Sequence, residues 1–89
     1  MTKSTTSIRL DLKEIRDVII FAGDECDYKS LLKEVNECKN QLIELLDQAE
    51  TPSELDIINE LNERATFYQK ILGNIQKRRE TLSDQSENV

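Results

Sequence analysis

The sequence contains no histidine and none of the glycine-rich motifs that bind nucleotide phosphates. Histidine is the commonest general base and metal ligand in proteins, so its absence removes much acid–base and metal chemistry. Asp24, Glu25 and Asp27 gather in the stretch GDECDY. They lack the spacing of a calcium-binding loop, and we interpret them as a solvated capping loop. We therefore expect no catalytic residue, no metal site and no cofactor, and a protein that is not an enzyme.

Long apolar runs are missing as well. No stretch approaches the ~20 residues of a membrane span, and the opening residues MTKSTTS lack the apolar segment of a signal peptide. Basic residues are outnumbered, with 12 Lys and Arg against 18 Asp and Glu and a net charge of -6. Nucleic acids and anionic membranes attract basic surfaces. We therefore expect a cytoplasmic protein with no membrane span and no direct nucleic-acid partner.

Cysteine, glycine and proline are scarce. Two cysteines in a chain without a leader are more often free thiols than a disulfide, although a bond between Cys26 and Cys38 is conceivable. Cys38 falls in an apolar helical pattern, so we expect it to be buried. Of the two glycines and one proline, two fall at or near the boundaries of the helical segments described next.

Three segments with helical periodicity lie between polar ends. Residues 1–7 are predicted to be a flexible N-terminus, and residues 83–89 a disordered polar tail. Residues 8–82 form one helical domain, because a chain of this size buries only a modest core.

The first segment is short. Asp11 and Glu14 are spaced as a capping box, and Gly23 is a typical helix stop, so the spacing predicts a helix at about 12 to 22. The stretch SIRLDL also alternates like a strand, but it has no second strand to pair with. The apolar face contains Ile8, Leu12, Ile15, Ile19 and Ala22, with Val18 beside them.

The second segment shows the clearest pattern. Asp27 is a good N-cap, and the apolar residues then step by three and four for three heptads. This stripe spans roughly 160° of the helix, which is typical of a helix with two neighbours. Its residues are Tyr28, Leu31, Val35, Cys38, Leu42, Leu45 and Ala49, widened by Leu32, Ile43 and Leu46.

The third segment opens with ETPSELD, in which Thr51 is the predicted N-cap, Pro52 the first helical residue and Glu54 the partner in a capping box. We predict a helix of about 28 residues, roughly 42 Å long. We attribute Gly73 to close packing, and the basic triplet at residues 77–79 to the negative end of the helix dipole. The apolar stripe contains Ile58, Leu61, Ala65, Tyr68, Leu72 and Ile75, broadened by Leu55, Ile57, Phe67 and Ile71.

The loop between the second and third segments is only about five residues long, AETPS, which forces the two helices into an antiparallel hairpin. The short first helix then lies in the groove between them. The predicted fold is therefore all-α, a three-helix bundle made of a long helical hairpin and a short N-terminal helix.

Residues 35–72 also resemble a known domain. They contain the pattern V-N-x-x-x-x-x-L-x-E-L-L, a short acidic loop, and then P-S-E-L-D-I-I-N-E-L-N. This resembles the first two helices of the GAT domain, the helical module of GGA-type endosomal sorting adaptors. The resemblance implies ubiquitin binding on a patch formed by Ile57 and Glu60, with Ile43 and Asp47 opposite. The alternative is that both isoleucines edge the core and that Glu60 is a solvated surface acid.

The broad apolar faces, the acidity and the lack of catalytic groups favour a non-enzymatic adaptor that binds another protein through a helical face. Two alternatives remain open. One is a small acidic regulator, of the inhibitor, antitoxin or phage-encoded type, that binds a basic protein target. The other is a self-associating coiled-coil structural protein, a homodimer in which residues 28–49 or 55–75 pair between chains.

Overall fold

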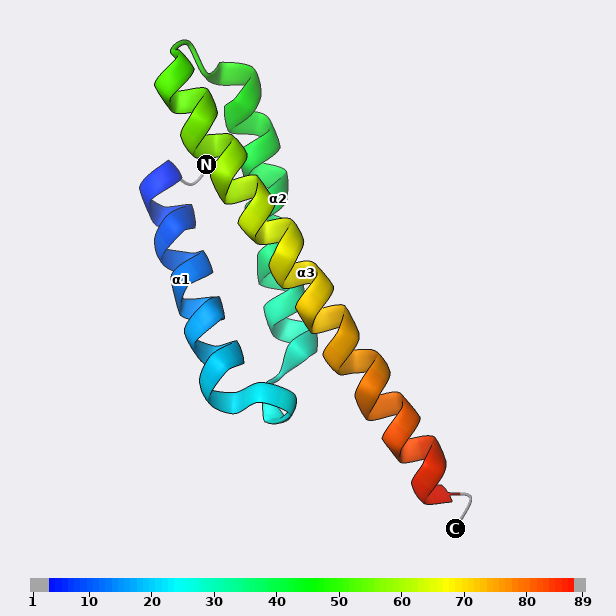
Figure 1. Cartoon of the computed structure of the whole chain (residues 1–89). Helices are drawn as coiled ribbons and strands as arrows, with labels where there is room; N and C mark the ends of the chain where they lie inside the picture. Colours follow the sequence, from blue (N-terminus) through cyan, green and yellow to red (C-terminus); the bar gives the residue numbers. More distant parts are fainter. Residues whose placement is uncertain (1–3, 88–89) are drawn as a thin grey trace.

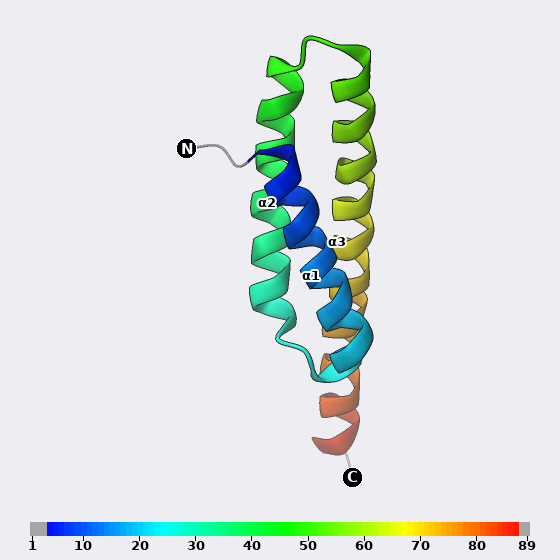
Figure 2. The same ribbon diagram turned by 90° about the vertical axis from the view of Figure 1, so that its left-hand side faces the viewer.

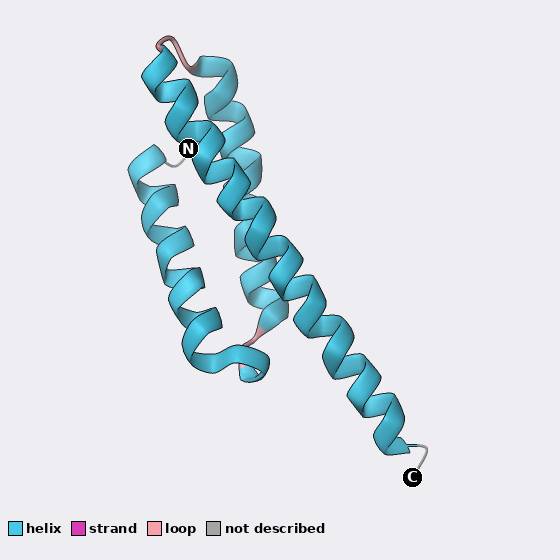
Figure 3. Cartoon of the chain, viewed as in Figure 1, coloured by secondary structure: helices cyan, strands magenta, loops and turns pink. Residues whose placement is uncertain are grey.

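Residues 4–87, which the computed structural model describes, fold into three α-helices joined by short connections (Figures 1 and 3). No strand occurs within this range. The predicted all-α three-helix bundle is therefore confirmed. In chain order the elements are α1 (Thr5–Ala22), a single 3₁₀ turn η1 (Gly23–Glu25), α2 (Tyr28–Gln48) and α3 (Pro52–Glu87).

The first helix begins earlier than its sequence suggested. Ser4 is the N-cap, because the Ser7 backbone N–H donates to Ser4 Oγ at 3.2 Å. Helix α1 therefore begins at Thr5, and residues 5–7 belong to its first turn instead of a flexible N-terminus. Residues 1–3, the rest of that predicted segment, lie outside the described residues.

The reason for this early start is the burial of Ile8, whose side chain is fully enclosed. Only a helix that begins before Ile8 aligns it with Leu12 and Ile15 on one face. The predicted capping box of Asp11 and Glu14 is wrong, since both residues lie inside α1. The strand-like alternative for SIRLDL is wrong for the same reason.

The connection between α1 and α2 has the stop and start signals that were predicted. Gly23 ends α1 with a φ of 54°, and its N–H donates to the Ile19 carbonyl. Asp27 caps α2: the Ser30 backbone N–H donates to Asp27 Oδ1 at 3.4 Å, and the Ser30 hydroxyl donates to Oδ2 at 2.8 Å. Both helix ends are therefore confirmed.

The tip of the hairpin is held by the predicted capping residues. The Glu54 backbone N–H donates to Thr51 Oγ1 at 3.2 Å, and α3 begins at Pro52. In a standard capping box the glutamate accepts from the N-cap N–H. Here Glu54 Oε2 accepts from the N–H of Glu50, one residue earlier, at 3.1 Å.

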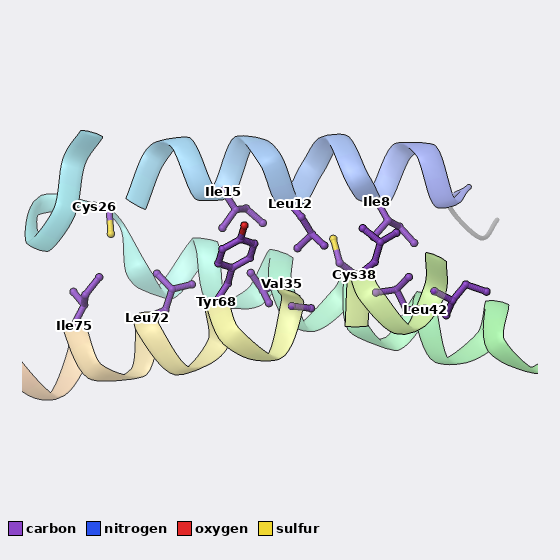
Figure 4. Close-up of a cluster of buried hydrophobic side chains, with 13 residues drawn as sticks. Ile8, Leu12, Ile15, Cys26, Val35, Cys38, Leu42, Tyr68, Leu72 and Ile75 are labelled. Atoms are coloured by element: carbon purple, nitrogen blue, oxygen red, sulfur yellow. The ribbon is translucent and has the colours of Figure 1, made fainter. Parts of the chain in front are cut away.

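Helix α1 lies over one groove of the α2–α3 hairpin (Figure 2), and side chains from all three helices meet in a single core (Figure 4). All six stripe residues predicted for the third segment are buried. The core consists of Ile8, Leu12, Ile15, Cys26, Val35, Cys38, Leu42, Ile58, Leu61, Ala65, Tyr68, Leu72 and Ile75.

The predicted apolar faces were too wide. Leu32, Ile57 and Ile71 pack against the core as expected. Ile43, Leu46, Leu55 and Phe67 instead remain exposed at the surface, as does Val18 on α1. Ile43, Leu46 and Leu55 are exposed because α1 covers one side of the hairpin and leaves their side uncovered. Phe67 and Val18 lie at the outer edges of the faces that α3 and α1 bury.

Helix α3 is 36 residues long, about 54 Å at 1.5 Å per residue, and therefore exceeds the predicted 28. No glycine or proline follows Gly73 to stop it. It continues to Glu87, so residues 83–87 are helical and not a disordered tail; residues 88–89 lie outside the described residues. In Figure 1 the end of α3 extends beyond the other two helices.

The basic triplet KRR does not lie at the end of α3, so its assignment to the helix dipole is wrong. Two of its members instead hold the α1–α2 connection. The Arg78 guanidinium lies 3.7 Å from Asp24 Oδ2. The Arg79 guanidinium lies 5.4 Å from the centroid of the Tyr28 ring and donates to the Cys26 carbonyl at 3.5 Å.

Gly73 has no packing role in the structure. A Cβ placed on Gly73 would meet no atom within 4 Å. The prediction that another helix packs closely against it is therefore wrong.

Both cysteines are free thiols and both are buried, so the disulfide alternative does not hold. The predicted burial of Cys38 is confirmed. Cys26 is part of the α1–α2 connection; its side chain belongs to the core, while its backbone carbonyl accepts the hydrogen bond from Arg79.

Candidate functional site

The four residues that the sequence suggested for protein binding do not form one surface. Glu60 lies on the side of α3 that faces α1, where it lines a shallow groove together with Arg9. Its carboxylate accepts a hydrogen bond from Arg64 at 2.8 Å. Ile57 precedes Glu60 by three residues and packs against the core. Ile57 and Glu60 therefore belong to the α1 side of the hairpin.

The opposite side of the hairpin is identified by hydrogen bonds that cross from α2 to α3. Lys39 Nζ donates to Gln69 Oε1 at 3.4 Å, and Gln69 Nε2 donates to Asn36 Oδ1. Glu34 and Glu37 line a groove against α1. Asn36 and Lys39 each follow one of these glutamates by two residues, about 200° around the helix. The hydrogen-bonded side chains therefore lie on the side that α1 does not cover.

Three large apolar side chains accompany these hydrogen bonds near the tip of the hairpin. On α2, Ile43 and Leu46 follow Lys39 by four and seven residues and therefore lie on the same side of that helix. On α3, Leu55 precedes Gln69 by fourteen residues, so it lies on the same side as Gln69. All three apolar side chains are therefore on the side of the hairpin where Lys39 and Gln69 are hydrogen-bonded. Ile43 is 49% exposed, and Leu46 and Leu55 are each 37% exposed. We call this surface the open face: Leu32, Asn36, Lys39, Ile43, Leu46, Leu55, Asn62 and Gln69.

One polar atom on the open face has no partner within the described part of the chain. Asn62 lies seven residues before Gln69, and its side-chain Oδ1 is buried without a hydrogen-bond donor. A buried acceptor without a donor costs roughly 1–3 kcal/mol. Because this oxygen has almost no exposed surface, it is a local cost to stability and not a contact point for a partner.

Ile43 and Asp47 are four residues apart on α2, and both are exposed. Ile43 belongs to the open face, and Asp47 lies beside it on the same helix surface. A partner that contacts this pair approaches from the side opposite Ile57 and Glu60. The four residues therefore offer two separate contacts and not one patch.

Other kinds of site find little support in residues 4–82, the range whose side chains the structure describes. No group of three or more cysteine, aspartate or glutamate side chains in this range is placed to hold a metal ion. Within the same range, no helix combines the length and the apolar character that a membrane crossing requires.

Sequence reasoning missed most of the open face because it assigned Leu46 and Leu55 to the core. A signal was available in the seven-residue steps that join Leu55, Asn62 and Gln69, since residues spaced by seven lie on one side of a helix. These steps mix apolar and amide side chains, which is typical of an accessible surface and not of a core.

Comparisons with family models, with curated proteins and with solved structures found no match to this chain.

Proposed function

We propose that this chain is a cytoplasmic, non-enzymatic interaction module that binds another protein by seating an α-helix of that partner on the open face of its hairpin. The observation that carries the proposal is the exposure of Ile43, Leu46 and Leu55 together on the side that α1 leaves uncovered. An antiparallel pair of helices has a groove on each side, and α1 occupies only one of them.

The chemistry of the open face fits this mode of recognition. Amphipathic helices bind in grooves through a few apolar anchors spaced by three or four residues, and Ile43 and Leu46 have that spacing. Polar groups that rim such anchors fix the orientation of the partner. Asn36, Lys39 and Gln69 supply that rim.

Ubiquitin is the first partner to test, because the GAT resemblance names it. The isotopically labelled chain is titrated with ubiquitin while its amide resonances are followed by NMR. Shifts confined to Ile43, Asp47 and their neighbours support ubiquitin binding on the open face. An unchanged spectrum removes ubiquitin as the partner, and shifts confined to Ile57 and Glu60 place the contact on the α1 side and contradict the open-face proposal.

Paired variants test the open face for any partner that the chain captures from its host. Ile43→Asp places a charge among the exposed apolar side chains, and Leu82→Asp makes the same change at an exposed leucine near the far end of α3. We expect Ile43→Asp to weaken binding by about 10-fold or more, which corresponds to ~1.4 kcal/mol. The Leu82→Asp variant retains wild-type affinity. Equal affinity of both variants would show that the partner binds elsewhere.

A further inference from the structure

Helix α1 carries its charged residues on two opposite sides. On the side toward α2, Asp11 and Glu14 face Glu34 and Glu37 across a shallow groove that these four residues line. Phe21 follows Glu14 by seven residues and is 88% exposed. This surface, the acidic flank, consists of Asp11, Glu14, Val18 and Phe21 of α1 with Glu34 and Glu37 of α2.

The side toward α3 has the opposite charge. Arg9 lines a groove there with Glu60, Leu61 and Arg64. Lys13 and Arg16 follow Arg9 by four and seven residues and therefore share its side of α1. Glu60, the carboxylate of this groove, is already bonded to Arg64. We call this surface, between α1 and α3, the basic flank.

Exposed apolar side chains accompany the basic flank too. Ile20 follows Arg16 by four residues and is 66% exposed, while Phe67 follows Arg64 by three and is 60% exposed. The basic flank consists of Arg9, Lys13, Arg16 and Ile20 of α1 with Arg64 and Phe67 of α3. Figure 2 shows α1 in front of the hairpin, with α2 on one side of it and α3 on the other.

We propose that this chain assembles with further copies of itself by seating the acidic flank of one copy against the basic flank of the next. The acidic flank combines four carboxylates with Val18 and Phe21. The basic flank combines four basic side chains with Ile20 and Phe67; two of the four, Arg64 and Arg16, are paired with Glu60 and Asp17, so the flank keeps a smaller positive charge. Opposite charges on facing surfaces steer association and fix its register, while Val18 and Phe21 of one copy cover Ile20 and Phe67 of the other. A second copy is the occupant because the same chain supplies both complementary surfaces.

The geometry of this contact determines the type of assembly. The two flanks are different surfaces, so the contact is heterologous, and a bound pair of copies leaves one acidic and one basic flank free. Such contacts continue into a ring or an open chain of copies. The inference goes beyond the proposed function, because the open face lies on the other side of the hairpin and is not used.

Sedimentation velocity of the wild-type chain over a range of concentrations gives the first test. We expect species larger than one 10.3 kDa chain at about 0.01 M ionic strength, where charges act over ~30 Å, and single chains at about 1 M, where they act over ~3 Å. A chain that stays monomeric at low salt, or an assembly that resists high salt, would overturn the proposal.

Charge reversals at exposed positions test the two flanks separately. Glu34→Lys with Glu37→Lys leaves the acidic flank with two acidic and two basic side chains, and Lys13→Glu with Arg16→Glu does the same to the basic flank. Each double variant therefore loses the charge of one flank and keeps the other flank intact. Each double variant alone should sediment as a single chain. An equimolar mixture should form pairs, because the intact basic flank of one variant meets the intact acidic flank of the other. Circular dichroism of each variant verifies that its helices are retained.

A matched control separates this contact from an effect of net charge. Lys70→Glu with Lys77→Glu changes the net charge as much as the Lys13 and Arg16 reversal does, at exposed positions on the outer side of α3. The control should assemble like the wild type. Failure of the mixture to assemble would refute the contact. A monomeric wild type that binds a lysine-rich helical peptide on its acidic flank would also refute it and would assign that flank to a basic partner protein.

Discussion

The two glycines provide a test in which one chemical change has opposite effects on stability. Gly73 lies inside α3, and a Cβ added there meets no atom within 4 Å. Alanine is favoured over glycine in a helix interior by about 0.8–1.0 kcal/mol. Since no neighbour must move, Gly73→Ala should raise the free energy of unfolding by roughly that amount.

Gly23 has equally open surroundings, with no atom within 4 Å of an added Cβ. Its φ of 54° and ψ of -127°, however, are a conformation that residues with a side chain rarely adopt. Holding such a residue in a sparsely populated region costs about 1–3 kcal/mol. Gly23→Ala should therefore lower the free energy of unfolding by that amount, because of backbone conformation and not because of crowding.

Urea and thermal unfolding, followed by circular dichroism, compare both variants with the wild type. For a domain of this size, 1 kcal/mol corresponds to roughly 4–8 °C in Tm. We expect Gly73→Ala to melt above the wild type and Gly23→Ala below it. If Gly73→Ala destabilises, α3 has a close neighbour at that position and the packing described above is wrong. If Gly23→Ala stabilises, the conformation of the α1–α2 connection is wrong.

Three further substitutions test the core, the hairpin tip and the α1–α2 connection. Leu42→Ala removes a fully buried side chain and should lower the free energy of unfolding by about 2–5 kcal/mol. The control Lys33→Ala, at an exposed position of the same helix, should change it by less than ~0.5 kcal/mol. Equal urea midpoints for the two variants would contradict the assignment of the core. Thr51→Ala removes the cap of α3 and should lower stability by about 0.5–2 kcal/mol, measured in the same way. Arg79→Leu removes the contact of a guanidinium with an aromatic ring and should lower Tm, by an amount equivalent to about 0.5–1 kcal/mol. Lys77→Leu, on the exposed side of the same helix, should leave Tm unchanged, and equal effects would show that the contact does not stabilise the connection.

Helix boundaries could be predicted where one residue type has a specific backbone role. Gly23 supplies the positive φ that ends α1, Asp27 accepts the N–H of the first turn of α2, and Thr51 does the same for α3. The other boundaries lacked such a unique signal. Asp11 and Glu14 have the spacing of a capping box, so the start of α1 at Ser4 was missed. The burial of Ile8, which lies before Asp11, requires the earlier start.

Most of the core was predictable because a stripe of apolar residues fixes one side of each helix. The candidate site was not, because a stripe does not show how much of its width the neighbouring helices cover. Ile43 and Ile57 have the same chemistry and similar places in the pattern. Ile57 is covered because α1 packs on its side of the hairpin, whereas Ile43 is left exposed. That distinction depends on tertiary packing and has no equivalent in the local sequence.

The separation of the surfaces determines how the two proposals combine. The flanks adjoin α1, and the open face lies on the reverse side of the hairpin, so both can be occupied at once. An assembly of copies would therefore present several open faces together. A partner with two linked helices would then gain from effective concentration, which can raise avidity by about 10²–10⁴ over a single contact. Reversal of Lys13 and Arg16 should abolish this gain and leave the affinity of a single helix unchanged, whereas Ile43→Asp should weaken both. If reversal of Lys13 and Arg16 lowers the affinity for a single partner helix as much as the affinity for two linked helices, the flanks and the open face are one binding surface. The two roles assigned to them are then not separate.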